Sequence, residues 1–243
     1  MIFSLFLASA AQAAQTPKSA PPRPTAPRAI TFKTSDGWLI AASYRAPRPG
    51  RAVLILAHGV ASSRNEWEPF AARLAEQGVG SLALDLRGHG ESRRGPNGEM
   101  DLASFDATGE WPRAVQDFAA AAAWLRARGV PAARVAFGGA SIGANLASLA
   151  ASKRQAAPFL LLLSPSENYH GVGLDVRPGL KTLAAASAPD GYAFAGVRAL
   201  AARTPTVDAL EAPAGHGVQM FADPATFDRI VAWVAKASDS LKP

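Results

Sequence analysis

The sequence predicts an α/β protein with one open, mostly parallel β-sheet that carries helices on both faces. Strand-like and helix-like segments alternate through nearly all of the chain after residue 28. Several strand-like segments are continuous apolar runs, which is typical of strands buried on both sides of a parallel sheet. The length of 243 residues fits a single domain of this kind.

A β-hairpin is expected at the start of the domain. The runs AITFKT and WLIAASYRAP are strand-like, and Ser35-Asp36-Gly37 separates them as a glycine-containing turn. The buried runs AVLILAHG and SLALDL follow as two strands, with a helix expected over residues 67–77 between them. A long helix is expected in WPRAVQDFAAAAAWLRARG, because Pro112 suits its first turn and Gly129 its end.

The second half of the chain continues the alternation. RVAFGG and PFLLLLS are expected strands, with a helix over residues 142–153 between them. KTLAAAS, a helix over 192–203, the short strand TVDAL and a closing helix over 225–237 complete the domain. Ligands of such sheets bind at the carboxyl ends of the strands, so the loops that follow strands are where functional residues are expected.

Composition excludes several classes of function. The chain has no cysteine, which excludes disulfides, thiolate metal sites and a cysteine nucleophile. The net charge is +6, but residues 1–28 hold three bases and no acid, which leaves 22 bases against 19 acids, or +3, in the rest. Those bases form no basic helix face and no pattern interleaved with aromatics, so no nucleic-acid partner is expected.

The N-terminus is typical of an export signal. An apolar run over residues 2–11 precedes Ala11 and Ala13 in the A-x-A spacing of a signal-peptidase site, which predicts a signal peptide over residues 1–13 and a periplasmic or extracellular protein. The alternative is a buried or disordered N-terminal segment. Ten apolar residues are too few to span a bilayer, which needs about 20, so no stable membrane insertion is expected after signal removal. Residues 14–28 hold five prolines and predict a flexible linker, which places the folded domain at 29–243.

The pentapeptide Gly139-Ala140-Ser141-Ile142-Gly143 fits the pattern G-x-S-x-G. It follows the strand RVAF and opens the helix SIGANLASLAAS, which is the strand-turn-helix setting of a nucleophile elbow. A turn this sharp leaves no room for side chains two residues before or after the serine, and it lifts the serine hydroxyl out at the sheet edge. The alternative is that Ser141 merely caps the helix.

A serine hydroxyl needs a base and a group that orients the base. His216 follows the last strand and Asp190 follows the preceding one, so the order Ser, Asp, His is that of this kind of elbow. Glu167 and Asp208 are the alternative orienting carboxylates, and Asp190 could instead be a turn residue. Among the other histidines, we expect His58 and His89 to hold loops beside the site, whereas His170 either lines the pocket or is exposed.

Five motifs together resemble the serine-hydrolase branch of the α/β-hydrolase superfamily over residues 29–240: His58-Gly59, LDLRGHGES, GASIG, PDG and GHG. The resemblance implies a three-layer fold with a mostly parallel eight-stranded sheet. It also implies a catalytic triad of Ser141, Asp190 and His216, and an oxyanion hole made by the backbone N–H groups of Ile142 and Val60. Dehalogenases and epoxide hydrolases of this fold use Asp at the elbow and dienelactone hydrolases use Cys, whereas this chain has Ser.

The leading hypothesis is hydrolysis of a carboxylic ester of a small or medium acyl substrate through an acyl-enzyme, with no metal or organic cofactor. Only 17 residues, 164–180, separate two strands where this family usually inserts a large cap, so the site is expected to be open. Trp111, Tyr169 and Tyr192 are candidate substrate-binding residues, with core packing as the alternative role. A peptidase or thioesterase, or a non-catalytic binding protein, remains an alternative, and the oligomeric state is left open.

Overall fold

The computed structural model describes residues 26–241. The expected signal peptide at 1–13 and nearly all of the expected linker at 14–28 lie outside the described residues. The first strand begins at Arg28, one residue before the expected start of the domain. Among residues 26–241, no helix combines the length and apolarity needed to cross a bilayer.

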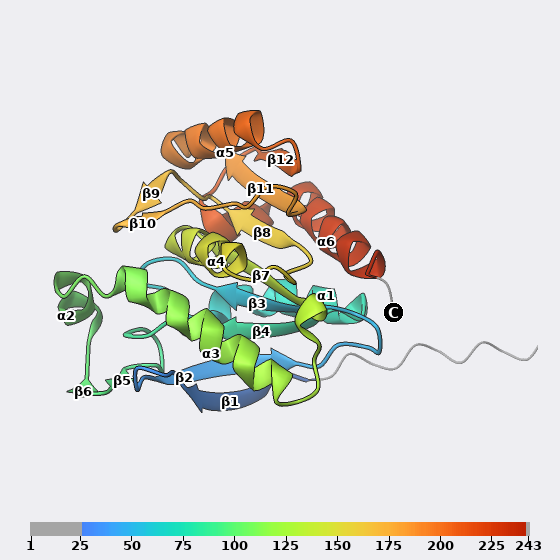
Figure 1. Ribbon diagram of the computed structural model, residues 1–243. Helices are drawn as coiled ribbons and strands as arrows, with labels where there is room; N and C mark the ends of the chain where they lie inside the picture. Colours follow the sequence, from blue (N-terminus) through green and yellow to red (C-terminus); the bar gives the residue numbers. More distant parts are fainter. Residues whose placement is uncertain (1–25, 242–243) are drawn as a thin grey trace, which may run out of the picture.

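A single eight-stranded sheet forms the centre of the molecule, with the strand order β1-β2-β4-β3-β7-β8-β11-β12 (Figure 1). The pairs β1–β2 and β2–β4 are antiparallel, and the other pairs are parallel. The mostly parallel sheet predicted from the sequence is therefore confirmed. Its strands are β1 (Arg28–Lys33), β2 (Leu39–Arg45), β3 (Val53–Ala57), β4 (Gly80–Leu84), β7 (Val135–Ala140), β8 (Leu160–Leu163), β11 (Thr182–Ser187) and β12 (Val207–Ala212).

Helices cover both faces of this sheet (Figure 1). One face packs against α3 (Val115–Arg126), α4 (Ile142–Ser152) and α5 (Gly191–Arg203), and the other packs against α1 (Glu68–Glu76) and α6 (Pro224–Asp239). Successive residues of β3 belong to the two cores in turn: Val53 and Ile55 lie in the first, Leu54 and Leu56 in the second. Because both faces of the strand are buried, its sequence shows no in–out alternation.

Short elements between the main ones were not predicted. They are β5 (Arg94–Gly95), β6 (Gly98–Glu99), α2 (Leu102–Ala107), β9 (Asn168–Tyr169), β10 (Val172–Gly173) and the 3₁₀ helices η1 (Arg64–Trp67), η2 (Trp111–Ala114), η3 (Ala132–Arg134) and η4 (Gly217–Ala222). A segment of two to six residues is too short to display a hydrophobic period. The long helix expected from residue 111 accordingly starts as η2 and becomes α-helical only at Val115.

A buried arginine fixes the loop that follows β4. Arg87 is fully buried, and its Nε donates to Asp117 of α3 at 2.8 Å while its backbone N–H donates to the same carboxylate at 2.9 Å. Its Nη1 donates to Asp36 in the β1–β2 turn at 2.7 Å. Three separate parts of the chain are thereby joined, because the buried cation is paired with carboxylates.

Removal of the Asp117 carboxylate takes away the partner of Arg87 that is itself fully buried, so Asp117→Ala is expected to lower the free energy of unfolding by about 3–5 kcal/mol. Glu76→Gln is the control, because its ion pair with Arg73 is exposed and is expected to contribute less than about 1 kcal/mol. Urea unfolding of both variants measures the difference. Equal losses would contradict the assigned role of the buried pair.

Candidate active site

Ser141 occupies a strained bend between β7 and α4. Its backbone angles are φ 55° and ψ −126°, a conformation that residues other than glycine rarely adopt. Its N–H donates to the carbonyl of Leu163 at 2.8 Å, which ties the bend to the neighbouring strand. The Ser141 side chain makes no capping hydrogen bond to α4, so the alternative of a simple helix cap is wrong.

Two glycines make this bend possible. A Cβ at Gly139 would overlap with the carbonyl of Gly143, and a Cβ at Gly143 would overlap with the backbone of Ala57 and His58. Gly59 also lies against the bend, because a Cβ there would be 3.3 Å from that of Ser141. The elbow therefore depends on backbone segments that approach one another without side chains between them.

His216 and Asp190 meet in the loops that follow β12 and β11. The distance between His216 Nδ1 and Asp190 Oδ2 is 2.7 Å. The histidine loop is attached to its neighbours on both sides, because the Gly217 N–H donates to Ser164 Oγ at 2.8 Å and Ser187 Oγ donates to the Gly215 carbonyl at 2.7 Å. These bonds fix the position of the imidazole relative to the sheet edge.

The alternative carboxylates are engaged elsewhere. Glu167 accepts from Arg203 Nη1 at 2.7 Å, and Asp208 accepts from Trp233 Nε1 at 2.6 Å. Asp190 is thus the carboxylate that contacts the His216 ring.

A cavity of about 360 Å³ joins the serine and the histidine. Ser141 is 9% exposed, and the His216 side chain is 40% exposed. Ile142 is the first residue of α4, so its N–H has no partner within the helix. The residues that line the cavity are Gly59, Val60, Ser62, Glu66, Ala140, Ser141, His216, Gly217, Val218 and Gln219.

Sequence reasoning missed Glu66 and Gln219 in this cavity. Glu66 accepts a hydrogen bond from the Ser62 hydroxyl and a longer one, of 3.4 Å, from the Gly59 N–H. Burial raises the pKa of the Glu66 carboxyl, and these bonds oppose the rise. Gln219 accepts from the His216 N–H at 3.2 Å. Both side chains lie on short 3₁₀ helices, and segments of four and six residues are too short for their sequences to show which side chains face a cavity.

His58 and His89 hold loops, as expected. The His58 ring is fully buried, its Nε2 accepts from the Leu86 N–H at 3.0 Å, and its Nδ1 therefore donates to the Gly59 carbonyl at 2.7 Å. Burial lowers the pKa of His58 to about 3, so the ring is neutral. The His89 ring lies beside it, with a centroid distance of 5.1 Å, and its Nδ1 contacts the Arg87 carbonyl at 2.9 Å.

The three aromatic candidates lie at different depths. Trp111 is only 1% exposed and belongs to the core, where its Nε1 donates to Asp106 at 2.8 Å, so its expected role as a pocket wall is wrong. Tyr169 is half-buried with its ring 6.5 Å from that of His216. Burial raises the pKa of the Tyr169 phenol, and hydrogen bonding with Ser166 and Ser141 acts against the rise.

Tyr192 and His170 lie farther out. Tyr192 is 58% exposed, packs edge-on against Tyr169 and donates to the Asn168 carbonyl at 2.9 Å. The His170 side chain is 38% exposed and lies 3.2 Å from Asp106. Among residues 26–241, no three histidine or acidic side chains are grouped as metal ligands.

The sheet topology and the serine bend are those of the α/β-hydrolases. Over residues 48–190, more than half of its length, the sequence matches the family described as serine aminopeptidase S33, and the chain belongs to this family. The family resemblance expected from the motifs is therefore confirmed.

Solved structures share the fold. A dienelactone hydrolase from Anabaena variabilis has a TM-score of 0.65 at 16% identity and covers 88% of this chain and 96% of its own. The carboxylesterase EstE1 from a metagenomic library has a TM-score of 0.66 at 18% identity, over 90% of both chains. Among curated proteins, protein phosphatase methylesterase 1 of Schizosaccharomyces pombe is 41% identical over 59 residues, which is 23% of this chain and 17% of that protein.

The contacts at the bend predict that Gly143→Ala lowers the free energy of unfolding by about 3 kcal/mol or more, because the new methyl group meets backbone that cannot move aside. Gly191→Ala is the matched control, since nothing lies within 4 Å of a Cβ there. It is expected to change stability by less than about 1 kcal/mol. Thermal and urea unfolding measure both variants. If Gly143→Ala is as stable as wild type, Gly143 does not lie as close to the backbone of Ala57 and His58 as described.

The buried neutral His58 predicts a pH dependence of stability. Its pKa is about 3 in the folded protein and about 6.5 in an unfolded chain, so unfolding takes up a proton between these values. The free energy of unfolding therefore falls as the pH falls through this window. The wild-type curve should be steeper than that of His58→Asn by up to about 1.4 kcal/mol per pH unit. Parallel curves in urea titrations from pH 3.5 to 7 would show that His58 is not held neutral.

Proposed function

We propose that this protein is a serine hydrolase that cleaves a carboxylic ester of a small or medium substrate through an acyl-enzyme intermediate. The observation that carries the proposal is the contact between His216 Nδ1 and Asp190, made in a loop that brings the same ring into the cavity of Ser141. An imidazole whose Nδ1 is occupied by a carboxylate presents Nε2 as the base.

In the proposed reaction, Ser141 Oγ attacks the ester carbonyl while His216 Nε2 takes the hydroxyl proton. The tetrahedral intermediate collapses, the C–O bond to the alcohol breaks, and His216 returns the proton to the departing oxygen. Water then attacks the acyl-enzyme with His216 again as base, which releases the carboxylic acid and restores the serine. Asp190 keeps the proton of the neutral ring on Nδ1 and stabilises the imidazolium.

The backbone N–H groups of Ile142 and Val60 are the proposed oxyanion donors. The amide of Ile142 is the first of helix α4, and Val60 lines the cavity beside Gly59. Each such donor contributes roughly 10²- to 10³-fold to the rate in comparable sites, because it faces the charge that develops on the substrate oxygen.

The cavity favours an ester over a peptide with a free amino terminus. An aminopeptidase needs a group that pairs with the substrate ammonium, and Glu66 is the carboxylate available beside the serine. Its two oxygens already accept hydrogen bonds from the 59–62 loop. The esterase activities named for the structurally similar EstE1 and for the methylesterase relative agree with this choice. Aminopeptidase activity, which the family description favours, is the second candidate.

Substitution of the proposed triad tests the function. With p-nitrophenyl esters of two to ten carbons, Ser141→Ala and His216→Ala are each expected to lose roughly 10⁴-fold or more in kcat. Asp190→Asn is expected to lose roughly 10²- to 10⁴-fold because the wrong imidazole tautomer is then favoured. Glu167→Gln and Asp208→Asn remove the two alternative carboxylates and are the matched controls, expected to stay within about threefold of wild type.

Aminoacyl p-nitroanilides measured in parallel identify the bond that is cleaved. If the protein hydrolyses the anilides faster than the esters, the proposed esterase activity is wrong and aminopeptidase activity takes its place. A fluorophosphonate probe is expected to label Ser141 stoichiometrically. A folded protein that is neither labelled nor active on either substrate class would instead be a binding protein.

A further inference from the structure

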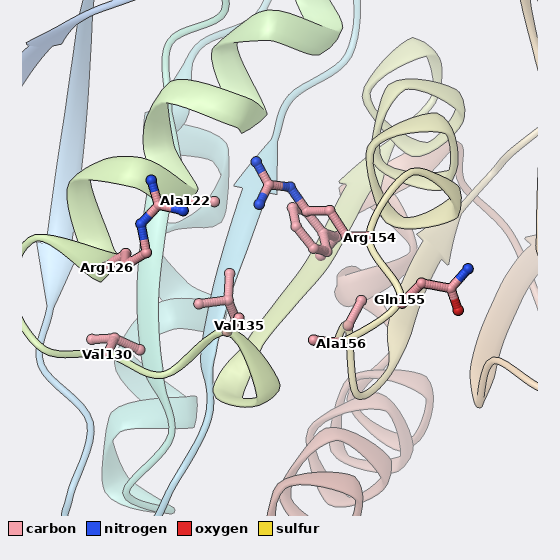
Figure 2. Close-up of a pocket in the computed structure, with 10 residues that line it drawn as sticks. Ala122, Arg126, Val130, Val135, Arg154, Gln155 and Ala156 are labelled. Atoms are coloured by element: carbon pink, nitrogen blue, oxygen red, sulfur yellow. The ribbon is translucent and has the colours of Figure 1, made fainter.

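A second cavity lies at the start of strand β7, whereas Ser141 follows the end of this strand. Figure 2 shows the residues that line the cavity. It has a volume of about 300 Å³ and lies between the end of α3, the start of β7 and the segment that follows α4. Strand β7 connects the two sites, because it begins with Val135 in this cavity and ends with Ala140 beside Ser141. At about 3.3 Å per residue, the five residue steps from Val135 to Ala140 span roughly 17 Å.

The residues that line this cavity, which we call the β7 pocket, are mostly apolar. Phe137 is 1% exposed and Val135 is 4% exposed, so the pocket reaches into the core between α3 and the sheet. Val130 and Ala132 extend the apolar lining toward the surface. Arg177 donates to the carbonyls of Gln155 and Ala157 at 3.1 and 3.0 Å, which fixes the backbone of the wall that follows α4.

Two guanidinium groups accompany this apolar lining. Arg126 comes from the last turn of α3 and Arg154 from the segment after α4. Figure 2 shows both guanidinium groups on the same side of the pocket, with Ala122 between them and Val130 and Val135 on the opposite side. Within residues 26–241, neither guanidinium has an acidic partner or a hydrogen bond to a carbonyl. Burial lowers the pKa of Arg154, and the charge of Arg126 adds to this effect.

Arg128 illustrates the ordinary role of an arginine at the end of a helix. Its Nη1 donates to the Trp124 carbonyl at 3.2 Å, and its guanidinium stacks on the Trp124 ring at 3.5 Å. Arginines at this position commonly satisfy the last carbonyls of a helix. Arg126 and Arg154 make no such bond among the described residues, so their donors remain free for an anion. Two like charges that line the same mostly apolar cavity favour a ligand that supplies both a negative group and an apolar body.

We propose that the β7 pocket binds a medium-chain monocarboxylate, with its carboxylate between Arg126 and Arg154 and its alkyl chain against Val135 and Phe137. A volume of about 300 Å³ holds roughly ten non-hydrogen atoms at about 30 Å³ each, which matches octanoate. Arginine pairs carboxylates through parallel hydrogen bonds, and the mostly apolar walls suit an alkyl chain. The site is separate from the proposed ester chemistry and does not depend on it.

Calorimetric titration of the full chain with octanoate tests the proposal, with the Ser141→Ala protein as host so that no acyl transfer contributes. The expected result is saturable binding with a Kd below about 1 mM, which is the strength of a small ligand held by two ion pairs and an apolar chain. Arg126→Ala and Arg154→Ala are each expected to weaken binding at least tenfold. Arg128→Ala removes the same charge outside the pocket and is expected to leave the Kd unchanged.

Further controls test separately the contribution of the two arginines, which bind the carboxylate, and that of the apolar lining, which binds the alkyl chain. Acetate, which lacks the chain, and octanol, which lacks the charge, are both expected to bind at least tenfold more weakly than octanoate. Ala132→Trp fills the pocket from an exposed position and is expected to abolish binding although both arginines remain, with an unchanged unfolding temperature in the absence of ligand. The proposal is overturned if octanoate fails to bind below 5 mM, if Arg154→Ala binds it as wild type does, or if acetate or octanol matches it. Octanoate binding and ester hydrolysis are measured separately. A protein that hydrolyses esters but does not bind octanoate would overturn only the proposed site, and the reverse result would overturn only the proposed function.

Discussion

The geometry of the proposed site depends on one strained bend in the backbone. Ser141 is held at φ 55° because the strand β7 stops and α4 starts without an intervening loop. The bend is possible because backbone carbonyl groups lie so close to Gly139 and Gly143 that a side chain at either position would overlap with them. A strained residue of this kind is maintained only when the surrounding structure fixes it, and here the surrounding structure is a fully buried strand and a largely buried helix.

The other groups reach Ser141 through the parallel topology of the sheet. Strands β7, β8, β11 and β12 are neighbours, so the loops that follow them meet at one edge. Ser187 and Ser164 then attach the loop of His216 to that edge, and Asp190 contacts the ring from the adjacent connection. The same strand β7 carries the second pocket at its other end, which places a polar cavity and a mostly apolar one on the same strand.

The sequence predicted the features that rest on strong local patterns. Continuous apolar strands, helices with a clear start and end, and the G-x-S-x-G turn each carry a direct physical signature, and the chain order of Ser141, Asp190 and His216 identified the side chains that the structure places at one sheet edge. What could not be predicted rests on contacts between distant segments. Trp111 was expected at the pocket, but a tryptophan in sequence looks the same in a core as in a wall, and the structure buries it. Glu66 was missed because nothing in its short polar segment indicates that the 59–62 loop folds over it.

The central claim is that Ser141 is the nucleophile and forms a covalent acyl intermediate. Rapid quenching of the protein with p-nitrophenyl octanoate, followed by mass spectrometry of the intact chain and its peptides, tests it most directly. The account predicts one acyl group per chain, located on Ser141 and formed together with a burst of p-nitrophenol. Full ester turnover with the acyl group on another residue, or with no acyl adduct in the presence of a burst, would contradict it.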